Sequence, residues 1–329
     1  MNKTIVVIGS NSFSGASFVD VALDQGYKVI GMSRSEEPSS VFLPYKWKEG
    51  RDFTFHQLDL NHDIDEMIRV IKEHKAEYVV NFASQSMVGE SWQHPEHWFM
   101  TNAVSTVKLH DQLRQLDFLD KYVHISTPEV YGTCEGLVQE HSNYNPSTPY
   151  AVSRAAGDMS LHSFEKAYNF PVVFTRAANV FGPGQQLYRI VPRAALYFMT
   201  GEKLQLHGGG HSVRSFIHIR DVSDGTLRIM NDGPIGEIYH LSTTRNISIR
   251  DLVAMVAEQV GVAFEDHVEV VGERLGKDSA YLLDAAKARN TLGWEDKISL
   301  EQGVEETIGW LRDNLDTIKK QPSDYIHKP

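Results

Sequence analysis

Short runs of apolar residues alternate with helically spaced apolar residues along the first half of the chain. Continuous apolar runs are typical of strands buried on both faces, and apolar positions three and four residues apart are typical of helices packed against them. This alternation predicts an α/β fold built on a doubly wound parallel sheet. The expected strands cover residues 4–8, 27–32, 53–58, 78–80, 122–125 and 170–175, and the expected helices cover 18–26, 63–74, 95–116 and 150–168.

The pattern changes after Gly184, where elements become shorter, loops become richer in glycine and arginines stand singly. We therefore expect a first domain over residues 1–184 and a smaller, mainly ligand-binding domain over 185–329. A segment at about 213–240 is expected to return to the first domain. The second half should hold a strand at 214–218 and helices at 221–230, 249–260 and 300–311.

Composition and charge narrow the class of protein. The chain has 329 residues, of which 41% are hydrophobic, and a net charge of −11. An acidic chain disfavours nucleic acid or an anionic membrane as its main partner, and no apolar run reaches the roughly 18 residues of a membrane-spanning helix. The single cysteine, Cys134, excludes an intramolecular disulfide and a cysteine metal cluster, and the histidines lack the spacing of a zinc site. We expect a cytoplasmic protein without a bound metal.

A glycine-containing turn follows the first expected strand. A strand, such a turn, a helix and a second strand form the unit that holds a dinucleotide pyrophosphate at a helix N-terminus in Rossmann-type folds. Glycines stand at positions 9 and 15, but a serine occupies position 12, where a middle glycine is common. An ordinary structural turn is therefore an equally good interpretation. The candidate dinucleotide contacts in this turn are Gly9, Asn11, Ser12, Phe13 and Gly15.

The ends of the next strands carry further candidate cofactor contacts. A site for NAD usually has an acid after the second strand to hold the adenosine ribose, whereas this chain has Arg34 between two serines and no acid before Glu36. Arg34 favours the 2′-phosphate of NADP, the alternative being a solvated loop residue. Asp59 is placed to cap the next helix or to accept the adenine amine. The remaining candidates are Leu60, Ala83, Gln85 and, in the long helix, Asn102.

The strongest candidate chemistry follows the fifth expected strand. Thr127 and Glu129 come directly after this strand, where α/β sheets form ligand crevices. Tyr150 and Arg154 stand four residues apart, on one face of the next expected helix. A phenol beside a fixed cation has a lowered pKa and can act as a base near neutral pH. Each piece alone is an ordinary loop or helix start, but their order favours a catalytic site.

Taken in this order, the motifs resemble those of the extended short-chain dehydrogenase/reductase family. Within it they resemble the nucleotide-sugar 4,6-dehydratases that act on GDP-mannose or dTDP-glucose. The resemblance covers nearly the whole chain. After the dinucleotide turn, its markers are Asp59-Leu60, Gln85-Ser86, residues 126–132, Tyr150 with Arg154, and the stretches 176–183, 214–221 and 274–281.

The resemblance implies a reaction without net redox change. The C4 hydride of the sugar passes to bound NADP or NAD, with Tyr150 as the base and Thr127 on the C4 oxygen. Glu129 then removes the C5 proton, so that water leaves from C6. Return of the hydride to C6 gives a 4-keto-6-deoxy sugar nucleotide.

Two residues depart from the family pattern. Dehydratases of thymidine sugars usually have an aspartate where this chain has Pro128, which has no proton to give, whereas those of guanosine sugars often have a serine there. Glu129 itself or water is then left to protonate the leaving hydroxyl. Arg154 replaces the usual lysine; it keeps the positive charge, but it is larger and planar, so the nicotinamide position can shift.

The resemblance also implies where the substrate and a second copy of the chain bind. We expect Arg214 and Arg274 to hold the diphosphate, because forked arginine donors match phosphate oxygens. Family members commonly form homodimers in which helices equivalent to 95–116 and 150–168 build a four-helix bundle. The other expected substrate contacts are Ser86, Asn179, Gln185, Arg189 and Arg193.

Three other functions stay open at this point. A UDP-glucuronate decarboxylase also has a glutamate at the place of Glu129, usually after a threonine and a serine. A 4-epimerase usually has none there, which makes that activity less favoured. A non-catalytic dinucleotide-binding protein would bind the cofactor without turnover.

Overall fold

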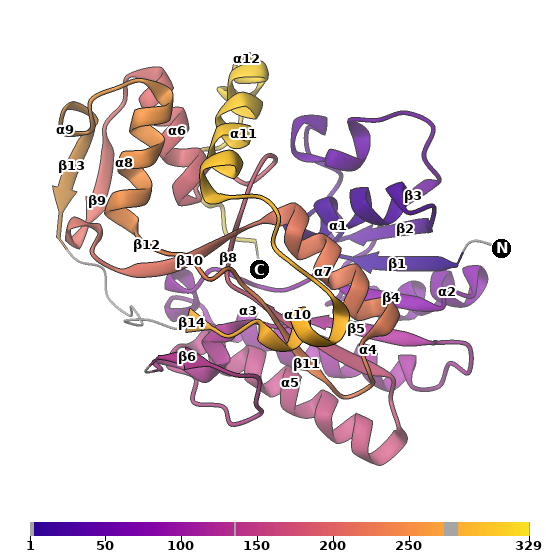
Figure 1. Ribbon diagram of the computed structural model, residues 1–329. Helices are drawn as coiled ribbons and strands as arrows, with labels where there is room; N and C mark the ends of the chain where they lie inside the picture. The colour runs from indigo at the N-terminus through magenta and orange to yellow at the C-terminus, as the bar shows by residue number, and fades with distance from the viewer. Residues whose placement is uncertain (1–2, 135, 273–281, 329) are drawn as a thin grey trace.

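The computed structural model describes residues 3–134, 136–272 and 282–328. Within these residues the centre of the molecule is a seven-stranded sheet in which every neighbouring pair of strands is parallel (Figure 1). This confirms the predicted α/β class and the doubly wound parallel sheet. In sheet order the strands are β11 (Ile238–Leu241), β7 (Val172–Ala177), β5 (Lys121–Ile125), β4 (Tyr78–Asn81), β1 (Thr4–Ile8), β2 (Lys28–Ser33) and β3 (Phe53–Gln57).

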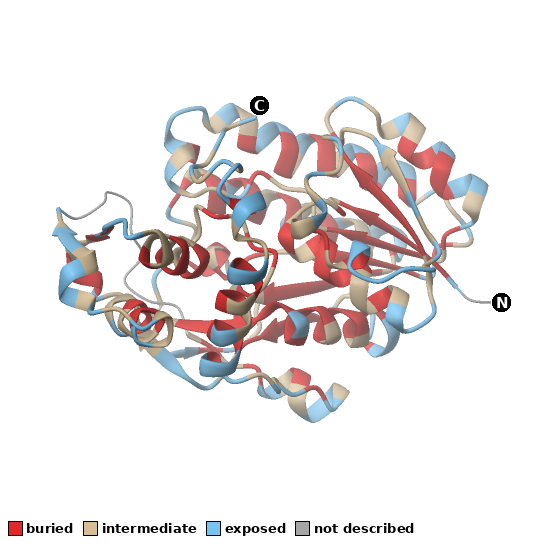
Figure 2. Cartoon of the chain, turned by 90° about the horizontal axis from the view of Figure 1, so that it is seen from above, coloured by how far each residue is buried: buried red, intermediate tan, exposed pale blue. Residues whose placement is uncertain are grey.

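Two layers of helices bury the two faces of this sheet. Along β1, Ile5 and Val7 pack into one core while Val6 and Ile8 pack into the other, because successive side chains of a strand point to opposite faces. In Figure 2 the inner strands of the sheet are mostly buried, whereas the covering helices are exposed on their outer sides and the edge strand β3 is only partly buried. The first core is covered by α1 (Phe13–Asp24), α7 (Ile219–Asp232) and α10 (Ala286–Leu292), and the second by α2 (Ile64–His74), α4 (Thr106–Leu113) and α5 (Pro149–Tyr168).

The single helix expected over residues 95–116 is interrupted. It is divided into α3 (Pro95–Phe99), a π-helical segment η4 (Met100–Ser105) and α4. The hydroxyl of Thr106, the first residue of α4, donates a hydrogen bond over 2.9 Å to the carbonyl of Thr101 in this segment. Apolar spacing does not reveal a π-helical segment inside a longer helix, because apolar side chains still recur on the buried face on both sides of it. Segments of this kind are frequent at functional sites.

The second half of the chain builds another core and also completes the main sheet. Its own core lies between α6 (Ile190–Thr200), α8 (Ile249–Val260) and α11 (Leu300–Asp313). β11 pairs with β7, and α7 shares the first core with α1. A three-stranded sheet links the two parts, in the order β12 (Asn246–Ser248), β10 (Val213–His218) and β8 (Asn179–Phe181).

The remaining elements are short. No helix within the described ranges combines the length and the apolar character that crossing a membrane requires. Two strand pairs are β6 (Leu137–Val138) with β14 (Leu282–Leu283), and β9 (Leu204–His207) with β13 (Val268–Val271). The short helical turns are η1 (Ser40–Phe42), η2 (Pro44–Lys46), η3 (Gly89–Trp92), η5 (Pro128–Tyr131), η6 (Gly208–Gly210), α9 (Phe264–His267) and α12 (Leu315–Ile318).

A buried polar network lies beneath the loop after β5. The Asp158 carboxylate, on α5, accepts hydrogen bonds from the Ser126 hydroxyl at 2.6 Å and from Arg176 Nη2 at 2.8 Å. His124 Nε2 lies 3.2 Å from the other oxygen of this carboxylate. His124, Asp158 and Arg176 are all buried. Although burial alone would raise it, these neighbours hold the pKa of the Asp158 carboxyl well below its usual value.

The same network reaches β11 through an aromatic residue. Arg176 donates to the hydroxyl of Tyr131, and that hydroxyl lies 2.7 Å from His240 Nε2. His240 Nδ1 lies 3.1 Å from the Asp284 carbonyl. Burial lowers the pKa of His240 to about 3, and the positive charge of Arg176 adds to the shift. Hence His240 is neutral in the folded chain near neutral pH.

The pH dependence of stability should report this buried histidine. Below the ordinary histidine pKa of 6.5, the unfolded chain takes up a proton that folded His240 does not. The free energy of unfolding should therefore fall with falling pH, by about 1.4 kcal/mol per pH unit for this one group. His240→Gln should reduce the slope by that amount between about pH 6 and pH 5, as measured by urea unfolding at several pH values.

A second substitution controls for the general loss of a histidine. His62 is exposed, and His62→Gln is the matched variant. A His240→Gln slope equal to that of the unsubstituted protein would show that His240 does not resist protonation in the folded state.

Candidate functional site

The candidate site lies at the carboxyl edge of the main sheet, where the loops after β1, β2, β4, β5 and β7 meet. Two cavities of about 590 Å³ and about 1050 Å³ adjoin there. They share Ser12, Arg34, Gln85 and Tyr325 among their lining residues, so they form one continuous cleft. We call them the smaller and the larger cavity.

Close packing explains both glycines of the turn after β1. Gly9 has a φ of +85°, and a Cβ there would come within 2.7 Å of the backbone nitrogen of Ala83, at the end of β4. A Cβ on Gly15 would overlap the carbonyl oxygen of Gly9. The start of α1 therefore lies directly against the end of the sheet, with no side chain between them.

Ser12 has a structural role that a glycine could not supply. It is the N-cap of α1, where its hydroxyl accepts from Gly15 N at 3.0 Å and donates to the Gly9 carbonyl at 2.7 Å. Its φ of −74° lies in a region that any residue adopts. The serine thus holds the turn closed and caps the helix, which accounts for the departure from the usual glycine pattern.

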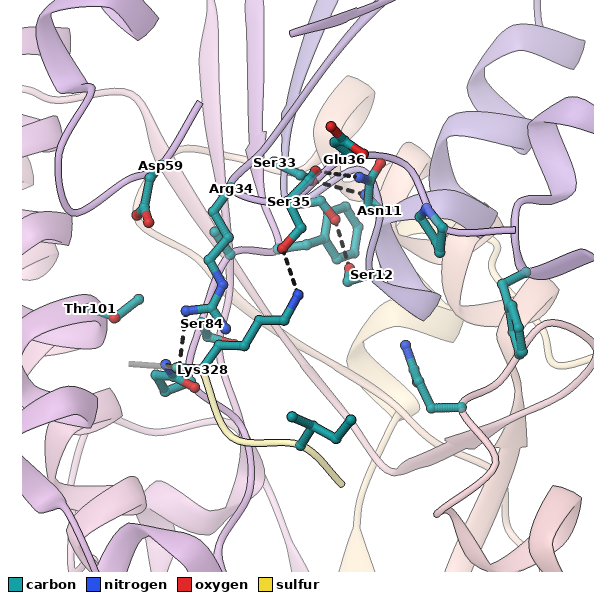
Figure 3. Close-up of a pocket in the computed structure, with 18 of the residues that line it drawn as sticks. Asn11, Ser12, Ser33, Arg34, Ser35, Glu36, Asp59, Ser84, Thr101 and Lys328 are labelled. Carbon is teal, nitrogen blue, oxygen red and sulfur yellow. Dashed lines mark hydrogen bonds between the residues drawn. The ribbon is translucent and has the colours of Figure 1, made fainter. Parts of the chain in front are cut away.

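Arg34 and its neighbouring serines form one wall of the smaller cavity (Figure 3). The Asn11 backbone N–H donates to Ser33 Oγ at 3.0 Å, and its amide donates to the Ser35 carbonyl at 3.0 Å. Arg34 Nη1 donates to the backbone carbonyl of Lys328 at 3.2 Å. Glu36 also lines the cavity and lies beside Asn11. This wall therefore carries hydroxyl, guanidinium and carboxylate groups.

Asp59 does not cap the following helix. Its carboxylate accepts from the backbone N–H of Asn61 at 2.7 Å, and the N-cap position of α2 is taken by Asp63. Asp59 remains on the smaller cavity, opposite Asn11 in Figure 3. The sequence predicts either helix capping or a contact with the adenine amine for Asp59. Since it does not cap α2, the contact with a ligand stays as the prediction. Leu60, Ala83 and Gln85 line the same cavity.

Asn102 has a different place from the one the sequence predicts. It is not among the described residues that line either cavity. Its amide accepts from Gln85 N at 2.8 Å and donates to the Gln85 carbonyl at 2.9 Å and to Ser153 Oγ at 3.0 Å. Asn102 therefore joins the π-helical segment to Gln85 and α5 and acts as a positioning residue.

The loop after β5 brings three predicted residues to the larger cavity, since Thr127, Pro128 and Glu129 all line it. Thr127 is the N-cap of η5, and its hydroxyl accepts from the Glu129 backbone N–H at 3.3 Å. Pro128 begins this turn, where a backbone N–H would have no partner and a φ near −65° is required. The neighbouring Ser126 instead points back to Asp158.

Tyr150 lines the same cavity from the first turn of α5, but its pKa differs from the prediction. Burial raises the pKa of Tyr150 above its ordinary value, and the negative charge of Glu129 adds to the rise. The positive charge of Arg154 and the hydrogen bond with the Thr127 hydroxyl lower it, but they do not offset burial. The prediction of a lowered pKa is therefore wrong for the chain alone, because the sequence does not show how deeply the phenol is buried.

Arg154 is buried beside Tyr150 and is only partly paired. One guanidinium nitrogen donates to the Ile125 carbonyl at the end of β5. Its Nε is buried and has no hydrogen-bond partner within the described part of the chain. A buried donor without a partner is costly. Since Arg154 lines the larger cavity, a ligand there is in place to supply the acceptor.

The other predicted substrate residues divide into three groups. Ser86, Asn179, Gln185, Arg189 and Arg193 line the larger cavity, and Phe13 lines it beside them. The Gln185 amide donates to the Val180 carbonyl at 2.8 Å. Arg214 is not among the described residues that line the two cavities. Arg274 lies outside the described residues.

One wall of the cleft comes from a segment that the sequence pattern does not predict. Gln321, Pro322, Asp324, Tyr325, Ile326 and Lys328, which follow α12, line the smaller cavity. They belong to no regular element, so apolar periodicity could not place them. Their only signal in the sequence is a mixture of aromatic and basic residues beyond the last helix.

These residues fit a nicotinamide dinucleotide. Gly9, Asn11 and Ser12 line the smaller cavity at the N-terminus of α1, which suits a pyrophosphate, whereas Gly15 is not among the described residues that line either cavity. Arg34 and Asp59 line the smaller cavity, and Arg154, whose Nε is buried without a partner within the described residues, lines the larger one.

Comparisons with known proteins agree with this arrangement. A family model described as GDP-mannose 4,6 dehydratase matches residues 6–307. The dTDP-glucose 4,6-dehydratase of Streptomyces antibioticus is 34% identical over 253 residues, which cover 76% of this chain and 75% of that protein. The enzyme of the same name from Xanthomonas campestris pv. campestris is 29% identical over 331 residues, with 94% and 93% covered.

A solved structure of similar shape extends the comparison. The dTDP-glucose 4,6-dehydratase DesIV of Streptomyces venezuelae, solved with NAD bound, has a TM-score of 0.88 and 27% identity, covering 95% of this chain and 98% of its own. The fold, the cleft and the family match therefore agree. Because the family model matches nearly the whole described chain, this chain belongs to the GDP-mannose 4,6 dehydratase family and is a nucleotide-sugar 4,6-dehydratase, an enzyme of the carbon–oxygen lyase type.

Proposed function

We propose that Thr127, Glu129 and Tyr150 carry out the dehydration of a nucleotide-diphosphate sugar in the larger cavity. The observation that carries this proposal is that all three residues line one cavity at the end of β5. Glu129 and Tyr150 lie close enough for the carboxylate charge to raise the pKa of the phenol. A base for a hydroxyl and a base for a carbon acid thus stand side by side.

The first role belongs to Tyr150 and Thr127. Tyr150 takes the proton of the C4 hydroxyl, while the Thr127 hydroxyl holds the C4 oxygen. When bound, the dinucleotide supplies the acceptor for the C4 hydride and its donor at C6, and the positive charge of its oxidised ring opposes the effect of burial on the Tyr150 pKa. Arg154 supports this end of the site, because its positive charge already lowers the pKa of Tyr150.

The second role belongs to Glu129. A ketone at C4 acidifies the C5 proton, which Glu129 removes. The same carboxyl then gives a proton to the C6 hydroxyl, which leaves as water, and C5 later takes a proton from solvent through Glu129. Pro128 cannot supply an acid here. It instead fixes the start of η5, so that one carboxyl at a defined position serves both proton transfers.

Replacing Glu129, the proposed base for the C5 proton, separates its role from that of Tyr150 and Thr127 at C4. Glu129→Gln should lower the rate of 4-keto-6-deoxy product formation by about 10²- to 10⁴-fold, because the amide cannot accept the C5 proton. In deuterated water, mass spectrometry should find deuterium at C5 of the product from the unsubstituted enzyme. The variant should incorporate it at a correspondingly reduced rate.

Glu258→Gln, at an exposed position on α8, is the matched control and should retain full activity. Unchanged product formation and C5 exchange in Glu129→Gln would remove Glu129 from the mechanism. Absence of any 4-keto-6-deoxy product from GDP, dTDP, UDP and CDP hexoses with the unsubstituted enzyme would contradict the proposal as a whole.

We infer that the cofactor is NADP in preference to NAD. The support is the wall at the end of β2, which presents Ser33, Arg34 and Ser35 to the smaller cavity. A guanidinium between two hydroxyls suits a ribose 2′-phosphate. Glu36 lies on the same wall, and its carboxylate is the group that would suit NAD. The similar DesIV enzyme was solved with NAD bound.

The nucleotide that co-purifies with the enzyme distinguishes these cofactors. Mass spectrometry of the denatured protein should identify NADP as the main bound dinucleotide. Arg34→Gln should shift the bound population toward NAD, because a charged hydrogen bond to the phosphate is lost. NAD alone in the unsubstituted protein would contradict the inference.

We propose that α5 and the helices beside it form a homodimer interface of four helices. α5 packs beside α3 and η4, and together these segments present large apolar side chains to the outside. Exposed large apolar side chains on helices packed side by side are typical of an interaction surface. Its residues are Phe99, Met100, Val104, Val152 and Met159.

A charge placed on this face should separate the protomers. Met159 is 57% exposed, and Met159→Arg would leave a desolvated, unpaired charge in the interface. Light scattering after size exclusion should give the mass of a dimer for the unsubstituted protein and of a monomer for this variant. Val270→Arg, at an exposed position on β13, should remain dimeric. A monomeric unsubstituted protein would contradict the proposed interface.

A further inference from the structure

The end of the described chain forms a wall of the cofactor cleft. After α12, the segment 321–328, which we call the C-terminal segment, lies along the smaller cavity. In Figure 3 it passes below Arg34 and brings Lys328 between the wall of β2 and the side that carries Asp59 and Thr101. The segment therefore borders the part of the cleft where the adenosine half of a dinucleotide is expected.

Aromatic stacking anchors this segment to the first half of the chain. The His327 ring is parallel to that of buried Trp98 on α3, with an angle of 7° and centroids 5.1 Å apart. His97 Nδ1 lies 2.9 Å from His327 Nε2, and the Tyr325 hydroxyl lies 3.2 Å from His327 Nδ1. These contacts fix the position of the next residue, Lys328.

A second set of contacts anchors the segment to the other side of the cleft. Arg193, on α6, donates to the Asp324 carboxylate at 2.6 Å and to the Ser323 carbonyl at 2.7 Å. The rings of Tyr188 and Tyr325 meet edge to face, 5.4 Å apart. The segment thus bridges the cleft between α3 and α6.

Lys328 is held at both its backbone and its side chain. Its carbonyl accepts from Gln85 Nε2 at 2.6 Å and from Arg34 Nη1 at 3.2 Å. Its Nζ lies 3.0 Å from Ser35 Oγ, across the smaller cavity. An ammonium group is therefore fixed beside the hydroxyl that follows Arg34.

The charges around this point favour an anion. Arg34 and Lys328 supply two cations to one end of a cavity in a chain whose net charge is −11. Of the acids that line the cavity, Asp324 is paired with Arg193 and Glu36 lies beside Asn11. Asp59 stands on the opposite side in Figure 3. Two cations and a serine hydroxyl are suitable donors for a phosphate monoester.

We propose that the C-terminal segment is a wall of the cofactor site and that Lys328, with Arg34 and Ser35, binds the 2′-phosphate of NADP. This proposal rests on the proposed NADP preference. It adds Lys328, which is far in sequence from the dinucleotide turn, to the residues that select NADP over NAD. The alternative, in which the segment blocks the cleft and leaves when the cofactor binds, predicts the opposite response to NADP.

Calorimetric titration of the full-length protein with NADP and with NAD separates these possibilities. Lys328→Gln should weaken NADP binding by about 10- to 100-fold, because a charged hydrogen bond is lost. Its affinity for NAD should change less than about twofold, since NAD has no 2′-phosphate. Lys328→Arg should restore most of the NADP affinity. Lys320→Gln removes the same charge at an exposed position that is not among the lining residues, and it should bind as the unsubstituted protein does.

The outcomes distinguish this proposal from the ones on which it rests. Equal losses for NADP and NAD in Lys328→Gln would show only a structural role, and unchanged NADP affinity would remove Lys328 from the site. An unsubstituted protein without preference for NADP overturns the cofactor inference and the phosphate role together. These titrations measure binding alone. A protein that bound NADP as expected but lacked dehydratase activity would therefore contradict the proposed reaction and not the role of Lys328.

Limited proteolysis tests the position of the segment independently. Chymotrypsin cleavage after Tyr325 removes the residues that follow it, and intact-mass spectrometry detects this loss. Saturating NADP should slow this cleavage, since the cofactor packs against the segment. Faster cleavage with NADP would show that the segment leaves the cleft, and it would overturn the proposal.

Discussion

The buried carboxylate of Asp158 joins the segments on which the candidate site is built. Asp158 comes from the same helix as Tyr150 and Arg154, and it holds Ser126 directly beside Thr127. Its other partner, Arg176, belongs to β7 and also donates to Tyr131 at the end of η5. Asp158 therefore ties the helix that carries Tyr150 to the loop that carries Glu129. A helix shift that moved Tyr150 would have to break a hydrogen-bonded ion pair away from water.

Such an arrangement has an energetic cost as well as a benefit. A buried ion pair loses the hydration of both charges, and an apolar pair of the same size is often at least as stable. The pair is useful here because its hydrogen bonds are directional, so they fix the loop after β5 in one orientation. The phenols of Tyr131 and Tyr144 accept further hydrogen bonds from Arg176, and His124 Nε2 lies 3.2 Å from the second oxygen of Asp158. Stability and catalytic geometry thus depend on the same few polar atoms.

Much of the fold followed from the sequence because its signals are local. The strands, most helices and the placement of Thr127, Glu129 and Tyr150 on one cavity could be predicted from apolar periodicity and from the rule that parallel strands end at one edge. The deviations have non-local causes. The raised pKa of Tyr150 depends on burial by distant segments, and the role of Asn102 depends on Gln85 lying opposite it across the fold. The contacts of Lys328 involve residues far away in sequence, in a segment without periodicity.

The contact between Arg193 and the C-terminal segment has a thermodynamic consequence. Arg193 lines the larger cavity, while its guanidinium is bonded to a segment that lines the smaller one. The two cavities therefore share one structural element, and the Arg193–Asp324 bond connects their walls. Coupling of this kind is reciprocal. A ligand that changes the affinity of the other cavity through the Arg193–Asp324 contact must have its own affinity changed by the same factor when that cavity is filled.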